Sequence, residues 1–252
     1  MTAIQAPPHE QRIAVGMRSL VEVVARCGPG GRTLLPVVRA TGAMAVRRTG
    51  EHRIHLVATA FGPLGGDIAV IRLHIEEGAR LKVCSVAASV CLPSREPAPS
   101  RAELHAEVAD GGRLNILLEP TVVAAGAEHH AGTEIALSGE ARLRVTERVI
   151  LGRYGEVPGR WIGTTRLERD GHPVLHTTIE LGQGSPMWNW PTTARAYATD
   201  LVLDGEAPAT ARTGPKAVLL PLVGGLVSTA WGERLDQVLA ANDNLITTRG
   251  GG

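Results

Sequence analysis

The sequence predicts a mainly β protein, a β-helix-like stack of sheets built from repeated hairpin units and followed by a C-terminal amphipathic helix. Three observations predict it. Short β-type segments alternate with glycine-containing turns about every dozen residues, a strand–turn–strand motif recurs in the middle of the chain, and one late segment has helical periodicity. We treat residues 1–252 as a single domain, with flexible ends at residues 1–12 and 247–252, where no periodicity is visible.

The strands are predicted from runs of apolar and β-branched residues between turns, such as residues 19–26, 53–59 and 68–75. The repeated motif is a strand, an acidic-glycine turn and a second strand. Its copies share this order and are found at residues 72–81, 103–114, 135–143 and 166–175. Repeats of this kind are typical of stacked architectures, because one hairpin cannot bury its apolar face and neighbouring copies cover it. The alternative is that Asp-Gly and Glu-Gly turns are simply common in antiparallel proteins.

The helix is predicted over residues 226–239. Apolar residues recur there at intervals of three and four, a spacing typical of one apolar helical face, and the pattern ends near Asn242. The uncharged run of residues 217–232 is shorter than the ~20 apolar residues that a membrane span needs, and it contains Pro221. We therefore expect no membrane-spanning segment.

Composition and charge exclude several classes of function. The chain is 44% hydrophobic and 20% charged, as in soluble globular proteins, and its formal net charge of +1 contains no long block of one sign. Nucleic acid and membrane surfaces are therefore not expected partners. Cys27, Cys84 and Cys91 cannot all pair within the chain, and no signal peptide is evident, which predicts a cytoplasmic location.

Catalytic signatures are absent from the sequence. There is no phosphate-binding GxxxxGK[ST] loop, no GxSxG nucleophile turn and no HExxH metal motif, so we expect neither an enzyme nor a tightly bound cofactor. His129 and His130 are adjacent, and on a regular strand their side chains would point to opposite faces. The alternative function is a β-helical carbohydrate-active enzyme with paired carboxylates, although aromatic residues make up only 3% of the chain.

Four motifs in order resemble the UreD (also called UreH) family of urease accessory proteins. The first is a strand that enters a glycine-rich turn closed by Gly65, Gly66 and Asp67, in which the two glycines have a structural role. The others are residues 77–81, residues 118–122, and residues 147–153 with the following Gly-Glu pair. The similarity covers about residues 15–245, and residues 85–92 depart from the family's pattern.

This resemblance implies a scaffold that bridges urease apoprotein to UreF and to UreG, the GTPase of the assembly, within a hetero-oligomeric complex. It also implies an internal passage through which Ni²⁺ moves toward the urease active site, so that the ion is cargo in transit. Such a passage needs oxygen or imidazole ligands that bind weakly and exchange. Position within the family motifs selects four candidate carboxylates: Asp67, Glu119, Glu147 and Glu156.

Each candidate carboxylate has a structural alternative, as a turn cap, as an acceptor of backbone hydrogen bonds or as the partner of a neighbouring arginine. A second hypothesis concerns a proline-bounded loop in which Met187, Trp188 and Trp190 would form a partner interface, since aromatic residues often anchor interfaces. The alternative is that this loop covers the core. Arg153 is a further candidate for the interface, or else a member of an ion pair.

Overall fold

The computed structural model describes residues 16–96, 98–186, 194–208 and 210–247, which form two large sheets, a short 3-10 turn at Pro29–Gly31 and one α-helix. The seven-stranded sheet has the order β14-β13-β11-β8-β5-β1-β2. Its strands are β1 Arg18–Cys27, β2 Thr33–Thr41, β5 Ile68–Ile75, β8 Ser100–Val108, β11 Glu128–Leu137, β13 Arg160–Arg169 and β14 His172–Gly182.

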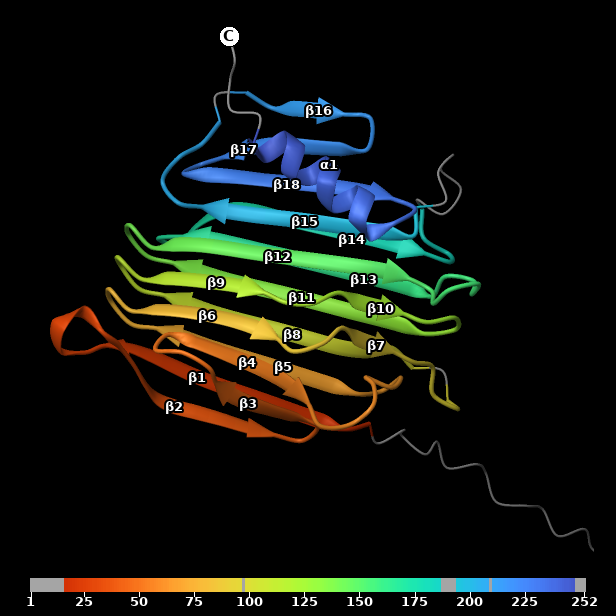
Figure 1. Ribbon diagram of the computed structural model, residues 1–252, viewed down its shortest axis with the longest axis horizontal. Helices are drawn as coiled ribbons and strands as arrows, with labels where there is room; N and C mark the ends of the chain where they lie inside the picture. Colours follow the sequence, from red (N-terminus) through yellow and green to blue (C-terminus); the bar gives the residue numbers. More distant parts are fainter. Residues whose placement is uncertain (1–15, 97, 187–193, 209, 248–252) are drawn as a thin grey trace, which may run out of the picture.

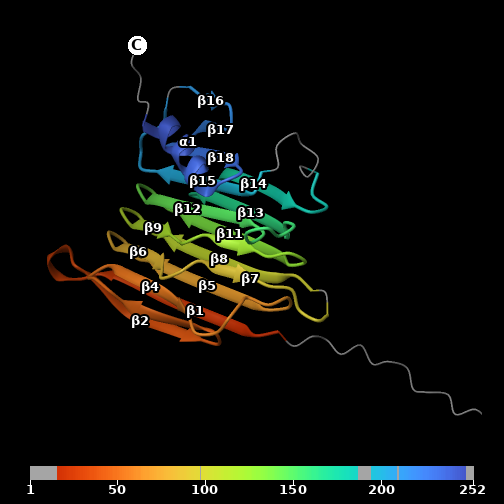
Figure 2. The same cartoon turned by 45° about the vertical axis from the view of Figure 1, so that its right-hand side comes forward.

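The eleven-stranded sheet has the order β16-β17-β18-β15-β12-β9-β6-β4-β3, with the short strands β10 and β7 added beside β12. Figures 1 and 2 show the two sheets stacked face to face. The strands of this sheet are β3 Met44–Arg48, β4 Arg53–Ala58, β6 Arg80–Ser85, β7 Ser89–Cys91, β9 Arg113–Leu117, β10 Thr121–Val123, β12 Arg142–Leu151, β15 Ala196–Leu203, β16 Arg212–Gly214, β17 Ala217–Leu222 and β18 Gly225–Gly232.

The predicted mainly β stack is confirmed, and its repeating unit is a corner between two sheets. In the copies at residues 72–81, 103–114 and 135–143, the first strand belongs to the seven-stranded sheet and the second to the eleven-stranded sheet. Each strand pairs in parallel with the equivalent strand of the next copy. Only the copy at residues 166–175 is an antiparallel hairpin, formed by β13 and β14.

The turns at these corners explain why corners form. The backbone N–H of Ala109 donates to the carbonyl of Ile75 at 2.9 Å, and that of Ser138 donates to the carbonyl of Val108 at 2.9 Å. The parallel ladder therefore continues through the turns from one coil to the next. Gly78 and Gly111 hold the same position in successive turns, with φ of 65° and 64°, a backbone conformation that favours glycine.

The core lies between the two sheets and is built from aligned rows of apolar side chains. Leu81 pairs in register with Leu114, which pairs with Leu143, and none of the three is more than 2% exposed. Each coil therefore buries its leucine against the leucines of its neighbours. There are two further core clusters. One surrounds Trp161 and includes residues of β7, β10, β12 and β15, and the other lies under the helix.

The C-terminal helix is confirmed, but the prediction that it begins at residue 226 is wrong. Residues 225–232 form strand β18, which pairs with β15 on one side and β17 on the other. The helix α1 is Leu235–Thr247 and packs on β15, β17 and β18 through Val238, which is 1% exposed. Gly224, with φ of 73°, makes a tight turn after β17, and the hairpin pairing that follows decides in favour of strand. The described helix is too short and too polar to cross a bilayer.

We predict that Leu114→Ala lowers the free energy of unfolding by about 3 kcal/mol, because it removes a fully buried side chain from the middle of the leucine row. Urea denaturation measures this loss. Asn115→Ala is the matched control on the same strand, since Asn115 is exposed and should change stability by less than about 0.5 kcal/mol. Equal effects of the two substitutions would contradict the inward assignment of Leu114.

Candidate functional site

The four candidate carboxylates lie in two different environments. Asp67 and Glu156 are in loops that return the chain from the eleven-stranded sheet to the seven-stranded sheet. Glu119 lies in the short link between β9 and β10, and Glu147 is on strand β12. Among the described residues, no three His, Cys, Asp or Glu side chains are grouped so that they could hold a metal ion. The four candidates therefore do not form one closed binding site.

Asp67 holds the first return loop together. One carboxylate oxygen accepts a hydrogen bond from the backbone N–H of Met17 at 2.7 Å, and the other accepts from the backbone N–H of Leu64 at 2.8 Å. Gly66 adopts φ of 92°, and a Cβ at Gly65 would lie 2.5 Å from a neighbouring carbonyl oxygen, so both glycines are required by the turn. This geometry fits the structural alternative for Asp67.

Glu156 also has structural partners. Its carboxylate accepts a hydrogen bond from Nε of Arg153 at 2.7 Å and from the backbone N–H groups of Arg153 at 3.0 Å and Ala125 at 3.3 Å. The hydrogen bond from the Arg153 side chain is the main reason that the pKa of Glu156 falls to about 2. By contrast, the side chain of Glu119 is exposed, and its backbone N–H donates to the Ser85 hydroxyl at 2.8 Å.

Glu147 is different because it faces the interior. Alternate residues of β12 point to the same side, and Glu147 shares that side with Leu143, Val145, Val149 and Leu151. The first two of these apolar residues contact the large core cluster and the last two belong to the cluster around Trp161. Glu147 therefore lies at the boundary between two apolar regions.

The carboxyl group of Glu147 has no partner among the described residues, which give it no hydrogen bond and no ion pair. The side chain is partly buried, and this burial raises the pKa of the carboxyl group to about 7. Pairing with Arg148 is not observed, since that side chain lies on the opposite face of β12 and influences Asp200 instead. A buried carboxyl group without a partner is energetically costly, which marks it as a candidate functional group.

Other polar side chains accompany Glu147 at this boundary. Thr199 pairs with it in register on β15, and the Thr199 hydroxyl donates to the carbonyl of Ser228 at 3.0 Å. The pKa of Tyr197 is raised, first by burial and then by the charge of Glu147, so the two groups are close. On the facing sheet, Thr133 and Thr165 pair in register at inward positions. Side chains with oxygen atoms, contributed by both sheets, thus lie in the interior between the two apolar clusters.

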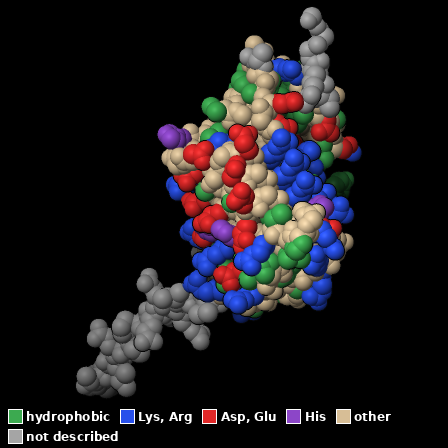
Figure 3. All heavy atoms as spheres, turned by 90° about the vertical axis from the view of Figure 1, so that its left-hand side faces the viewer, with side chains coloured by type: hydrophobic (Ala, Val, Ile, Leu, Met, Phe, Trp, Pro, Cys, Tyr) green, Lys and Arg blue, Asp and Glu red, His purple; other side chains and the backbone are tan. Residues whose placement is uncertain are grey.

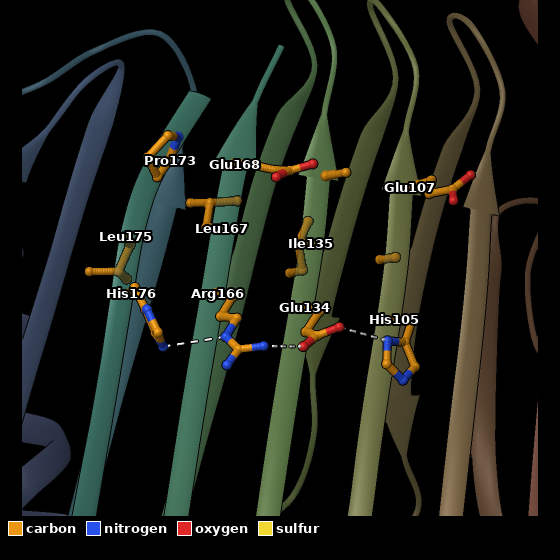
Figure 4. A pocket seen from close by; sticks show the side chains of 12 residues that line it. His105, Glu107, Glu134, Ile135, Arg166, Leu167, Glu168, Pro173, Leu175 and His176 are labelled. Atoms are coloured by element: carbon orange, nitrogen blue, oxygen red, sulfur yellow. Dashed lines mark hydrogen bonds and ion pairs between the residues drawn. The ribbon is translucent and has the colours of Figure 1, made fainter. Parts of the chain in front are cut away.

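The outer face of the seven-stranded sheet carries two hollows of about 440 Å³ and 450 Å³, both of which include His105. Figure 4 shows a row of side chains in the first hollow, contributed by four neighbouring strands. In this row, Arg166 donates to His176 at 3.3 Å and to Glu134 at 3.0 Å, and His105 lies 3.3 Å from the other oxygen of Glu134. The row therefore neutralises its own charges.

This row is not evident from the sequence, because its members are far apart in the chain and only the strand register brings them together. The repeated motif was the available signal, since aligning its copies would have placed His105 beside Glu134.

The candidate interface is described only in part. Met187, Trp188 and Trp190 lie outside the described residues. Arg153 is described, and its side chain is 59% exposed even though it pairs with Glu156. Two fully exposed aromatic side chains in the return loops, Phe61 and Tyr154, were not among the predicted interface residues, although aromatic residues are enriched at protein interfaces. Phe61 lies in the loop between β4 and β5, and Tyr154 lies in the loop between β12 and β13.

The pKa of Glu147 predicts how stability depends on pH. Below the ordinary glutamate pKa of 4.5, the folded and unfolded chains are both protonated at this site, whereas between pH 4.5 and 7 only the folded chain keeps the proton. The free energy of unfolding therefore falls as the pH rises from 4.5 to 7, because only the unfolded chain releases its proton in that range. We expect Glu147→Gln to be more stable than the parent chain by roughly 2 kcal/mol at pH 8, and equally stable near pH 4, in urea denaturation.

Glu119→Gln is the matched control for this measurement, since Glu119 is exposed and its substitution should change stability equally at both pH values. A Glu147→Gln variant whose stability difference is the same at pH 4 and pH 8 would contradict the buried, protonated state.

Comparison with known proteins places these features in a family. Residues 18–230 match the family model described as UreD urease accessory protein. The chain is 36% identical to the urease accessory protein UreD of Frankia alni, over 98% of this chain and 94% of that protein. It is 39% identical to UreD of Streptomyces coelicolor over 71% of this chain and 72% of that protein, and 37% identical to UreD of Streptomyces avermitilis over 84% and 88%. The chain therefore belongs to the UreD family of urease accessory proteins.

Proposed function

We propose that the chain acts in urease maturation as a scaffold that bridges urease apoprotein to UreF and UreG and aids the delivery of nickel into the urease active site. Its similarity to urease accessory proteins along nearly its whole length supports a role in maturation. Ni²⁺ is the cargo of this function, and the protein holds it only in transit. The free state of Cys27, Cys84 and Cys91 is compatible with work in the reducing cytoplasm.

The observation that carries the nickel part of the proposal is the unpaired carboxyl group of Glu147 inside the solenoid. Burial raises the pKa of this group to about 7, so near neutral pH it can exchange its proton for a cation, and its negative charge has no permanent partner. Threonine and tyrosine oxygens lie at the same level of the interior. One carboxylate and several hydroxyl groups form a weak ligand set, which lets a divalent cation bind and leave.

The alternative of a carbohydrate-active enzyme has less support. An enzyme of that kind needs two carboxyl groups facing a cleft and, usually, aromatic side chains on which a sugar stacks. Here, Trp161 and Tyr197 are buried in the core with their ring centroids 5.6 Å apart. In the hollow of the seven-stranded sheet, Glu107 is paired with His74 and Glu134 with Arg166. Family membership also favours the accessory role.

The scaffold role predicts that this chain, co-expressed with UreF and UreG from the same source, elutes with them as one complex and activates urease apoprotein in the presence of nickel and GTP. The variant Trp188→Ala/Trp190→Ala should weaken this association, because aromatic side chains often provide much of the binding energy of an interface. Size-exclusion chromatography and urease activity measure the two effects.

Val223→Ala is the matched control for the tryptophan variant. Val223 is 79% exposed in the turn between β17 and β18, on the edge of the solenoid opposite the return loops. Truncation of its side chain should therefore leave the complex intact. The double tryptophan variant binding as tightly as the parent chain would exclude these residues from the interface, and failure of the parent chain to associate with any of the three proteins would overturn the scaffold role.

The passage role predicts that Glu147→Gln slows urease activation several-fold when nickel is limiting, because the amide keeps the shape of the side chain and removes its charge. Assembly with UreF and UreG should not change, since Glu147 lies in the interior. The measurement is the nickel content of urease together with its activity as a function of added nickel.

Glu77→Gln provides the control, since Glu77 is an exposed residue of the turn between β5 and β6, on the edge of the solenoid opposite the return loops. If Glu147→Gln loads nickel at the rate of the parent chain, Glu147 does not belong to the nickel route.

A further inference from the structure

The outer face of the eleven-stranded sheet concentrates positive charge. Arg80 on β6 pairs in register with Arg113 on β9, which pairs with Arg142 on β12. A second row beside it contains Arg53, Lys82 and Arg144, on β4, β6 and β12, with Asn115 of β9 between the last two. We call this surface the basic face and define it by its six cations: Arg53, Arg80, Lys82, Arg113, Arg142 and Arg144.

These cations form almost no ion pairs with acidic side chains of the chain itself. Within the part of the chain that the structure describes, the only ion pair of the basic face is a 3.7 Å contact between Arg144 and Asp200. Neighbouring strands in a sheet are about 4.8 Å apart, and like charges directly opposite one another are destabilising. The arginine row therefore reduces the stability of the isolated chain.

The other sheet shows that the fold does not require such an arrangement. Across its outer face, the register places Glu22 beside Arg72, then His105, Glu134 and Arg166. The opposite charges contact one another, with Arg72 3.7 Å from Glu22 and Arg166 3.0 Å from Glu134. The same stacking geometry thus mixes acidic and basic side chains along this row of the seven-stranded sheet, whereas the two rows of the basic face contain only cations and Asn115.

The basic face is also open. The only described α-helix, α1, packs on β15, β17 and β18, and leaves β4, β6 and β9 uncovered, as Figure 1 shows. Figure 3 looks at the turn edge of the solenoid, where a column of blue side chains runs beside a group of red ones. Acidic residues of the turns at this edge include Glu77, Asp110 and Glu140.

We propose that the basic face docks a partner protein of the urease assembly through a surface rich in aspartate and glutamate. Unpaired arginines in fixed register present guanidinium groups that bind carboxylates in bidentate geometry, and pairing with an acidic surface removes the repulsion within the row. The acidic turn edge repels a long polyanion that would extend past the row, which favours a protein over duplex nucleic acid. The inference rests on the proposed scaffold function and adds the surface that performs it.

The test uses the full chain and the variant Arg80→Gln/Arg113→Gln/Arg142→Gln. Binding to purified urease apoprotein and to purified UreF–UreG is measured separately, at low and at high salt. We expect the variant to bind one of these two partners about tenfold more weakly at low salt, with a smaller loss of affinity as salt rises. Its melting temperature should equal or exceed that of the parent chain, because neighbouring like charges have been removed.

A matched control is Arg18→Gln/Arg39→Gln/Arg101→Gln, which removes the same charge from exposed positions on the outer face of the seven-stranded sheet. Parent-like binding of the basic-face variant to both partners would overturn the inference, as would an equal loss in the control or tighter binding of the parent chain to a short DNA duplex. If the parent chain binds neither partner, the scaffold function itself fails and the inference falls with it.

Discussion

The parallel, in-register stacking of coils is the constraint on which the rest of the structure depends. A single coil of one strand from each sheet cannot satisfy its own backbone groups or bury its own apolar side chains, because both sets of partners come from the coils above and below. The hydrogen bonds that pass from turn to turn, such as Ala109 to Ile75, show that even the corners obey this rule. The antiparallel strands β2 and β14 end the stack of the seven-stranded sheet, where no further parallel coil follows.

This constraint makes the interior position of Glu147 informative. An inward position on a central strand is surrounded by other strands, so a side chain there cannot turn toward solvent as a surface carboxylate does. Leu143 and Leu151 on the same strand show what such positions ordinarily contain, since each is 2% exposed and packed in the core. The raised pKa of Glu147 is the electrostatic consequence of that position. The polar boundary between the two core clusters thus costs stability, which is the kind of cost expected at a functional region.

Periodicity was sufficient to predict the class of fold, and the spacing of the repeated motif was sufficient to predict stacking. The sequence does not distinguish a corner between two sheets from a hairpin, because both consist of an alternating strand, a glycine turn and a second alternating strand. In a hairpin the two strands pair with each other, whereas at a corner each strand pairs with a strand of a neighbouring coil. Residues 226–232 were assigned to the helix because their apolar positions fit a helical period as well as alternation, and pairing with β15 and β17 decided between them. For Asp67, the structural alternative named from the sequence agrees with its hydrogen bonds. Glu147 was selected as a candidate by its place in a family motif. Its burial could not be predicted in the same way, because it depends on packing against residues that are far away in the sequence.

Register also explains why surface charge in this fold cannot be judged from composition. A net charge of +1 suggests a nearly neutral surface, yet stacking places residues about one repeat apart next to each other, so a cation repeated at one position of the motif becomes a row. Arg80, Arg113 and Arg142 occupy the first position after successive turns, whereas one outward row of the preceding strands, Arg72, His105 and Glu134, contains both basic and acidic residues. A repeat that was shaped only by stability would avoid the first pattern and keep the second. The difference between the two faces is therefore a property of the sequence that becomes visible only in the fold, and the proposed binding of an acidic surface would offset the repulsion within the arginine row.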